Sequence, residues 1–189
     1  MEHRVRAILA LTIYFCAWSI TSARGYSVVA TKNNATLKFH IFYFGYGKIE
    51  GRFDRLRGKL DLNEKKPANS KILIEIDTAS INSNYKTRDS YLRSTAFLST
   101  IRYPKAFFRS SAVKAIDRHT VSVKGYLTLR GITRTITIMS RFTRDPSNRR
   151  NRTFRGSTSI HLSDFGINSI PSLFATKLFL TMRIDGIRR

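Results

Sequence analysis

Residues 84–110 read NYKTRDSYLRSTAFLSTIRYPKAFFRS, and this stretch contains the change of pattern that decides the fold. Its first part is polar with helical spacing, and we expect a short helix near residues 84–95, capped by Asn84 or Thr87. A break rich in small residues follows, and a Tyr-Pro pair then directly precedes an aromatic strand. The rest of the chain beyond residue 23 shows no other helical period and is expected to form strands.

Apolar residues recur at every second position on both sides of this stretch, which is typical of half-buried strands. Together with segments 26–31 and 106–113, these rows predict eight or nine antiparallel strands. Composition alone leaves a two-sheet sandwich and a closed barrel open. The rows that share a face are Leu37, Phe39, Ile41 and Tyr43; Leu56, Leu60 and Leu62; Ile72, Ile74 and Ile76; Val121, Val123, Leu127 and Leu129; Ile136, Ile138 and Phe142; Phe154, Thr158, Ile160 and Leu162; and Leu178, Leu180, Met182 and Ile184.

The first 23 residues have the order of a secretory signal peptide. Two arginines within the first six residues precede an apolar run from 7 to 20, and small side chains end the segment at Ala23. We expect cleavage after Ala23, a single domain over residues 24–189, and a periplasmic or secreted location. Cys16 falls in the removed segment, so the mature chain has no thiol for a disulfide.

The motifs that flank the helical segment occur in the order found in one known family. The chain resembles the YceI-like family over roughly residues 26–186. The resemblance implies a lipocalin-like β-barrel of about eight strands that encloses a long isoprenoid lipid and performs no chemistry. The matching blocks are the 84–110 stretch itself, Gly51–Asp54 (GRFD), Asp77–Ile81 (DTASI), Gly125–Thr133 (GYLTLRGIT) and Ser163–Ile167 (SDFGI).

The inward faces of the predicted strands provide the candidate ligand-binding residues. We expect an apolar lining made by Phe39, Ile41, Tyr43, Leu60, Val123, Leu127, Ile138, Phe142, Ile160 and Leu180. A shift of one residue in any strand would turn its row outward. Arg88, Asp89 and Tyr91 are placed where the helix meets the mouth of the barrel or a polar head group. The alternative is structural: Asp89 satisfies the start of the helix and Arg88 packs in an ion pair.

The chain is strongly basic, with 34 Lys and Arg against 12 Asp and Glu and a formal net charge of +22. Such a charge attracts anionic partners. It leaves a second hypothesis open, a surface module with a filled barrel that binds anionic lipid, lipopolysaccharide or another polyanion. A secreted chain meets an anionic membrane surface before nucleic acid, so nucleic acid is the least favoured partner. Monomer and homodimer are both compatible with the sequence.

Catalysis and metal binding find no support in the sequence. His40, His119 and His161 are widely spaced on separate predicted strands, and no pair has the short spacing of a metal site. A Gly-rich phosphate loop and an acid–base pair of carboxylates are also missing from the sequence. We therefore expect a non-enzymatic binding protein with no catalytic residue, metal or cofactor, and with an isoprenoid lipid or quinone as its non-covalent ligand.

Overall fold

The computed structural model describes residues 26–43, 47–63, 65–144, 147, 151–168 and 174–187. Their strands are β1 (Tyr26–Ala30), β2 (Ala35–Tyr43), β3 (Gly47–Phe53), β4 (Leu56–Leu62), β5 (Lys71–Asp77), β6 (Ile81–Asn82), β7 (Lys105–Ala115), β8 (Thr120–Leu129), β9 (Ile132–Arg144), β10 (Asn151–His161) and β11 (Phe174–Ile187). The helices are α1 (Lys86–Arg93) and the 3-10 turns η1 (Pro67–Asn69), η2 (Thr78–Ser80) and η3 (Leu162–Phe165).

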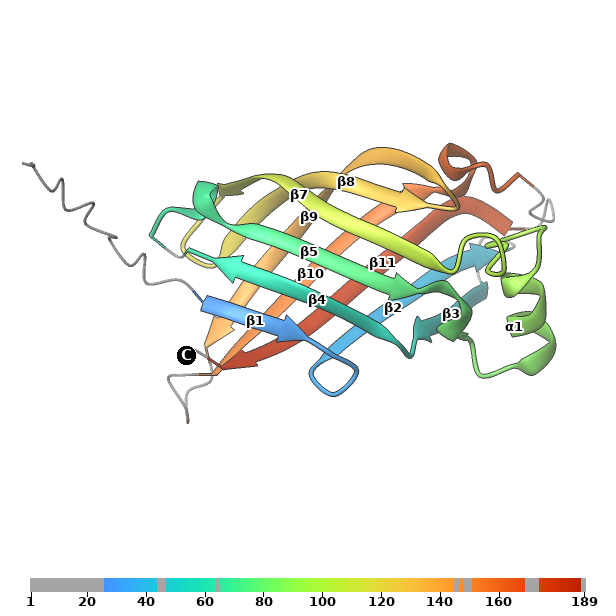
Figure 1. Ribbon diagram of the computed structural model, residues 1–189, viewed down its shortest axis with the longest axis horizontal. Helices are drawn as coiled ribbons and strands as arrows, with labels where there is room; N and C mark the ends of the chain where they lie inside the picture. Colours follow the sequence, from blue (N-terminus) through green and yellow to red (C-terminus); the bar gives the residue numbers. More distant parts are fainter. Residues whose placement is uncertain are drawn as a thin grey trace, which may run out of the picture.

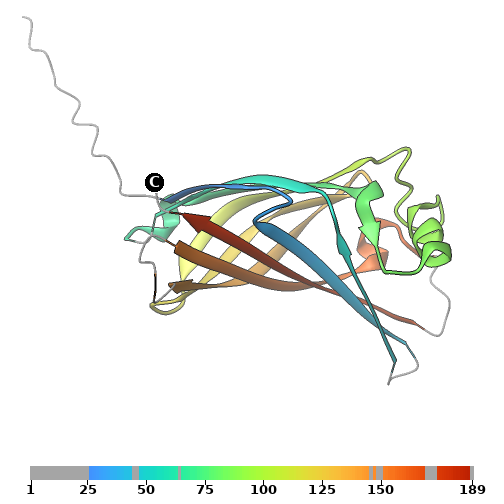
Figure 2. The same cartoon turned by 90° about the horizontal axis from the view of Figure 1, so that it is seen from below.

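The strands form one antiparallel sheet in the order β1-β4-β5-β7-β8-β9-β10-β11-β2-β3-β6, and this sheet curls around a central axis (Figures 1 and 2). The prediction of an all-β antiparallel barrel with one short helix is confirmed. Within the described ranges the sheet has eleven strands, so the expected count of eight or nine was too low. The expectation missed β3 and β6. Strand β6 has only two residues, and β3 has glycines where an alternating pattern needs apolar side chains.

One end of the β1 edge is joined to β11 by hydrogen bonds from the turn after β1. The side-chain amide of Asn34 donates to the carbonyl oxygens of Val29 at 3.0 Å and Asp185 at 2.9 Å. The amide N–H of Asp185 donates in return to the carbonyl of Asn34 at 2.8 Å. Gly186 lets Val28 pack here, because a Cβ at position 186 would lie 2.4 Å from its Cγ2. The curled sheet is thereby held together along this edge.

Helix α1 lies at the end of the barrel where β5 ends and β7 begins (Figure 1). The helix was correctly predicted, but its cap was not: Tyr85 is the N-cap residue and makes no side-chain capping bond. Two bonds from Arg93 fasten the helix to the wall, from Nε to the carbonyl of Ala79 at 2.8 Å and from Nη2 to that of Ile81 at 2.6 Å. Leu92 is buried beneath the helix.

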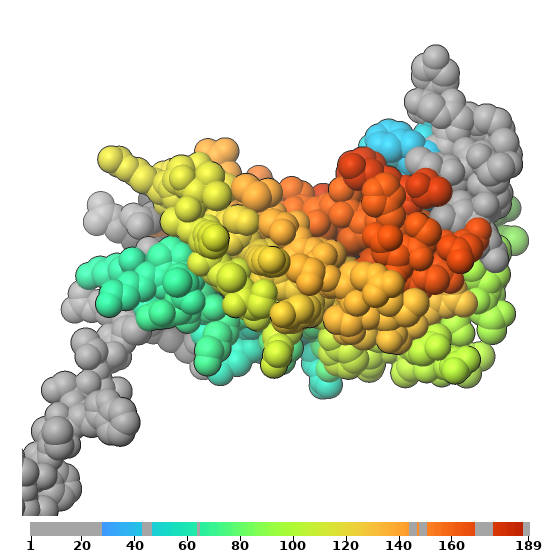
Figure 3. All heavy atoms as spheres, turned by 90° about the horizontal axis from the view of Figure 1, so that it is seen from above, coloured from blue at the N-terminus to red at the C-terminus, as the bar shows by residue number. Residues whose placement is uncertain are grey.

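Two of the sequence blocks meet at the same end. Arg130 and Gly131 form the tight β8–β9 turn, with φ angles of 53° and 75°, as a two-residue hairpin requires. The Arg130 guanidinium donates to the carbonyls of Gly166, at 2.6 Å, and Thr95, at 2.9 Å. It therefore ties η3 to the segment after α1. Seen from above, side chains of β7 to β10 form a continuous outer wall, and η3 lies at its α1 end (Figure 3).

Candidate functional site

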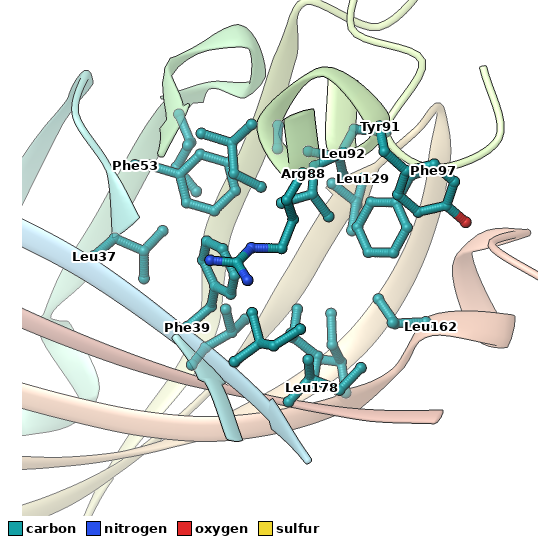
Figure 4. A pocket seen from close by; sticks show the side chains of 18 of the residues that line it. Leu37, Phe39, Phe53, Arg88, Tyr91, Leu92, Phe97, Leu129, Leu162 and Leu178 are labelled. Carbon is teal, nitrogen blue, oxygen red and sulfur yellow. The ribbon is translucent and has the colours of Figure 1, made fainter. Parts of the chain in front are cut away.

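A cavity of about 380 Å³ lies inside the barrel beneath α1 (Figure 4). Its lining is almost wholly apolar, and the polar groups come from the helical segment. The lining residues are Leu37, Phe39, Ile41, Ile49, Phe53, Ile76, Ile81, Tyr85, Thr87, Arg88, Tyr91, Leu92, Phe97, Leu98, Ala106, Leu127, Leu129, Ile160, Leu162, Leu178 and Leu180.

Five of the predicted lining residues border this cavity. Phe39 and Ile41 come from β2, Leu127 from β8, Ile160 from β10 and Leu180 from β11. Their strands are neighbours or near neighbours in the curled sheet. Period-2 alternation therefore identified the correct face of four strands, and the wall it builds is hydrocarbon.

Four other predicted residues also face the interior but do not reach this cavity. Leu60, Val123 and Ile138 border a small void of about 30 Å³ farther along the axis. Phe142 packs edge-on against Phe154, with ring centroids 5.2 Å apart. The expectation of one continuous lining is corrected in this respect, since these residues border a small separate void or pack against each other and do not border the cavity under α1. The Tyr43 side chain lies outside the described residues, and its place stays a prediction.

The far end of the barrel, opposite α1, holds a second cavity of about 400 Å³. Phe142 and Phe154 form part of its apolar floor, and Lys65, Arg118 and His119 contribute to its rim. Between the two cavities lies another void of about 50 Å³, which Leu127, Leu180 and Met182 border. The interior is therefore a series of unequal spaces along the axis. Of the two large cavities described here, the cavity under α1 has the more apolar lining.

Arg88 provides the charge inside the cavity under α1. In the close-up its guanidinium extends from α1 between Phe39 and Phe53 toward the centre of the space (Figure 4). Its Nε donates to the hydroxyl of Ser83 at 2.8 Å, and its Nη2 to the carbonyl of Ser83 at 2.7 Å. Among the residues that the structure describes, Nη1 has no hydrogen-bond partner. The guanidinium carbon also lies 5.6 Å from the ring centroid of Tyr85.

Asp89 is buried and does not border the cavity. Its Oδ1 accepts from the amide of Ser83 at 2.8 Å and from the hydroxyl of Ser83 at 2.5 Å. Asp89 therefore anchors Ser83, in the chain before α1, and does not face the space assigned to a ligand. The structural alternative had placed its bond at the start of the helix itself. The same Ser83 hydroxyl accepts from Arg88, so Asp89 orients Arg88 through Ser83. The structural alternative gave Arg88 an ion pair; among the described residues Arg88 bonds to Ser83 instead.

Tyr91 borders the cavity, and its ring packs against Phe97 with a centroid distance of 6.1 Å. Tyr85, Arg88 and Leu92 also face the cavity and follow one another at helical spacing. Tyr85, Leu92 and the buried Phe97 were missed by the sequence reasoning. The 3.6-residue period of α1 would have identified the first two, because Arg88 had already placed one face of the helix at the mouth.

The ionised side chains with shifted pKa values lie on the outer surface and not in the cavity. Hydrogen bonding from Arg57 at 2.8 Å, with support from Lys105 at 3.3 Å, holds the pKa of Glu75 below its ordinary value. Burial alone would raise the pKa of Asp77, but its hydrogen bond and charge contact with Arg55 at 2.9 Å lower it. These pairs stabilise the wall from outside and leave the cavity to apolar groups and Arg88.

Within the described residues, no cluster of three or more His, Cys, Asp or Glu side chains could hold a metal ion. A membrane-spanning helix is likewise not found in the part of the chain that the structure describes. The geometry of the site is that of a container: an apolar space, a helix across its mouth and one oriented cation.

Comparison with known proteins gives the same picture of the fold. The structure of BcnA from Burkholderia cenocepacia superposes with a TM-score of 0.75, covering 80% of this chain and 96% of that one at 20% identity. A polyisoprenoid binding domain from Saccharophagus degradans superposes with a TM-score of 0.68, covering 87% and 99% at 15% identity. At these identities the likeness concerns the fold.

Relatives in sequence cover the whole chain. A UPF0312 protein of Azotobacter vinelandii is 30% identical over 192 aligned residues, which cover 100% of both chains. A UPF0312 protein of Pseudomonas savastanoi is 33% identical over 97% of this chain and 96% of its own. The YceI-like domain matches residues 26–185. The resemblance expected from the sequence blocks is thereby confirmed, and the chain belongs to the YceI-like family.

Proposed function

We propose that this protein binds a long apolar lipid of the isoprenoid type, a polyprenol or a quinone, in the cavity beneath α1, and that it sequesters or carries this lipid. The observation that carries the proposal is the 380 Å³ apolar cavity, in whose lining, as far as the structure describes it, Arg88 is the one cationic residue. Its volume lies within the roughly 300–1,000 Å³ of typical small-molecule sites. The name of the Saccharophagus degradans neighbour, a polyisoprenoid binding domain, supports this choice of ligand. We also propose a periplasmic or secreted location, as expected from the signal-like first 23 residues.

Burial of the tail provides the affinity. A lipid that buries about 500 Å² of apolar surface gains about 12 kcal/mol before costs. Association consumes roughly 4–15 kcal/mol of this gain. Net affinity therefore requires a space that exists before the ligand arrives, and the wall of Phe39, Leu127, Ile160 and Leu180 encloses such a space. A wall that had to open would lose its own packing first.

Arg88 selects the head group in this proposal. Two of its donors are bound to Ser83, and among the residues that the structure describes Nη1 has no hydrogen-bond partner, so it is the donor that we assign to the head group. A guanidinium among hydrocarbon side chains favours an oxygen acceptor, such as a quinone carbonyl, a hydroxyl or a phosphate. The tail would then extend along the axis past Leu127 and Leu180 toward the small void beyond them.

Lipid uptake in a titration tests this function. A neutral quinone with an isoprenoid tail is titrated into the purified protein, with quenching of tyrosine emission as the signal. Leu127→Arg places a charge in the lining and should abolish uptake, whereas Tyr126→Arg, on the exposed neighbouring position of β8, should not. Circular dichroism establishes that both variants fold. If folded wild-type protein takes up neither quinone nor polyprenol, the proposal is wrong.

Salt separates this function from the polyanion hypothesis. Binding of a polyanion to the basic surface releases counterions and weakens steeply as salt rises. Uptake of a neutral lipid into the cavity should change little over the same range. A polyanion that binds tightly at low salt while the quinone does not bind at all would favour the surface module with a filled barrel.

A further inference from the structure

The outer face of the barrel wall carries an aromatic cluster on β2 and β11, where alternation would otherwise place polar residues. His40 stacks on Phe179 with ring centroids 4.8 Å apart and an interplanar angle of 4°. Phe42 meets both rings edge-on, at 5.4 Å from His40 and 5.8 Å from Phe179. Phe42 remains 37% exposed. We call these three residues the outer aromatic cluster.

Lysines flank this cluster, and one carboxylate, Glu50, lies opposite His40 in the β2–β3 register. The Nζ of Lys177 lies 5.6 Å from the centroid of the Phe179 ring. Lys38 is exposed on the same outer face of β2, two positions before His40. Among the residues that the structure describes, neither lysine has an acidic partner within ion-pair distance. Lys48, opposite Phe42 in the β2–β3 register, is compensated by Glu50 at 2.7 Å.

The outer aromatic cluster lies on the other side of the wall that encloses the cavity. Ile41 and Leu178 line the cavity from within, and they are the direct chain neighbours of Phe42, Lys177 and Phe179. The last residues of β2 and the first residues of β11 lie at the α1 end of the barrel (Figures 1 and 2). The cluster is therefore close to the opening through which a lipid would enter.

We propose that the outer aromatic cluster, with Lys38 and Lys177, docks the protein on an anionic lipid bilayer. Aromatic rings favour the interface between head groups and hydrocarbon, and lysines extend an apolar stem there while their charge meets anionic head groups. The net charge of +22 adds attraction over a longer range. Docking goes beyond the proposed function, because it does not require that the cavity be occupied.

The geometry favours a bilayer over a nucleic acid strand. Proteins that bind single strands combine a positively charged groove with aromatic faces free for stacking on bases. Here the rings lie on the convex outside of the barrel. The face-to-face stacking of His40 on Phe179 also uses ring surface that a base would need. A broad surface such as a bilayer requires neither a groove nor free ring faces.

Vesicle flotation tests the docking. Wild-type protein is mixed with vesicles of phosphatidylcholine alone and with vesicles that also contain phosphatidylglycerol. We expect flotation with the anionic vesicles only. Lys38→Gln and Lys177→Gln should each weaken partitioning about fivefold, as the loss of one lysine near an anionic surface predicts. Phe42→Ala should weaken it as well.

Matched controls lie on another part of the same outer surface. Phe107→Ala removes a ring that is 41% exposed on β7, and Lys124→Gln removes an exposed lysine on β8. Both should leave flotation unchanged. Equal loss in these controls, or no flotation of the wild type, would overturn the proposal. So would loss of binding to a single-stranded oligonucleotide in Phe42→Ala with vesicle binding intact.

The outcome is independent of lipid uptake. The docking variants should still take up a quinone with a short, water-soluble tail, because Ile41 and Leu178 on the inner face are unchanged. Docking without any quinone uptake would refute the proposed lipid ligand and leave the docking surface standing. Quinone uptake without docking would refute the docking surface and leave the proposed lipid ligand standing.

Discussion

Replacement of Ala106 by leucine should weaken lipid binding without destabilising the fold. Ala106 lies on β7, is 3% exposed and borders the cavity under α1. A leucine there would occupy space that we assign to the lipid tail. The added side chain displaces contacts equal to about three methylene groups, at about 0.8 kcal/mol each. The loss of about 2.4 kcal/mol corresponds to a Kd about 50-fold higher.

The same substitution has the opposite effect on unfolding. In an empty space the new leucine gains packing, so the free energy of unfolding should stay the same or rise by up to about 2 kcal/mol. In a filled interior it would overpack the core and cost about 1–3 kcal/mol. Urea unfolding and a quinone titration measure the two quantities on the same sample. Ala115→Leu is the matched control at the exposed far end of β7, and it should not change quinone affinity. Destabilisation by Ala106→Leu, or unchanged quinone affinity, would refute the reasoning.

Three further changes test other parts of the structure. Arg88→Leu should weaken the binding of a quinone at least about tenfold, since a charged donor contributes about 1.5–3 kcal/mol. The same variant should bind a polyprene without oxygen at least as well as the wild type does. The control Arg102→Leu should have no effect in the same titration. Gly51→Ala should cost about 1–3 kcal/mol of unfolding free energy, because its Cβ would lie 2.3 Å from the Phe39 ring and 2.8 Å from the carbonyl oxygen of Asn82. Phe39→Leu in the same chain should restore the part of this loss that comes from the ring, and an unchanged cost in the double variant would contradict the clash with Phe39. Because its pKa is lowered in the folded state, Glu75 stabilises the fold at pH values above its ordinary pKa of 4.5, and this contribution should disappear as pH falls through the folded pKa. Glu75→Gln should therefore flatten the pH dependence of the urea midpoint in acid. An unchanged slope would show that Glu75 does not contribute to the acid sensitivity of the fold.

The sequence predicted the fold class because strand and helix patterns are local. The row Leu37, Phe39 and Ile41 alternates strictly, and all three side chains are buried. Strand β3 was missed because Gly47 and Gly51 occupy two of its inward positions. A glycine is needed at position 51 because the ring of Phe39, on the neighbouring strand, occupies the space where a side chain would lie. A local pattern does not contain that reason.

The candidate site was predicted less completely than the fold. Alternation identifies the face on which a residue lies, but it does not give its depth along the barrel axis. Leu60 and Leu127 are both inward and buried, yet only Leu127 borders the cavity under α1. Arg88 and Asp89 are adjacent in sequence, and a rotation of about 100° about the helix axis separates the directions of their side chains. One therefore faces the cavity and the other faces Ser83.

The central claim is that an apolar tail occupies the space enclosed by Leu127, Ile160 and Leu180. Methyl-labelled protein, titrated with an isoprenoid quinone and observed by NMR, tests it most directly. We predict nuclear Overhauser contacts between the tail and the methyl groups of Leu127, Ile160 and Leu180, and none to the methyl group of Ile116, which is 60% exposed. Unchanged lining methyl signals at saturating quinone, or contacts confined to exposed methyl groups, would contradict the account.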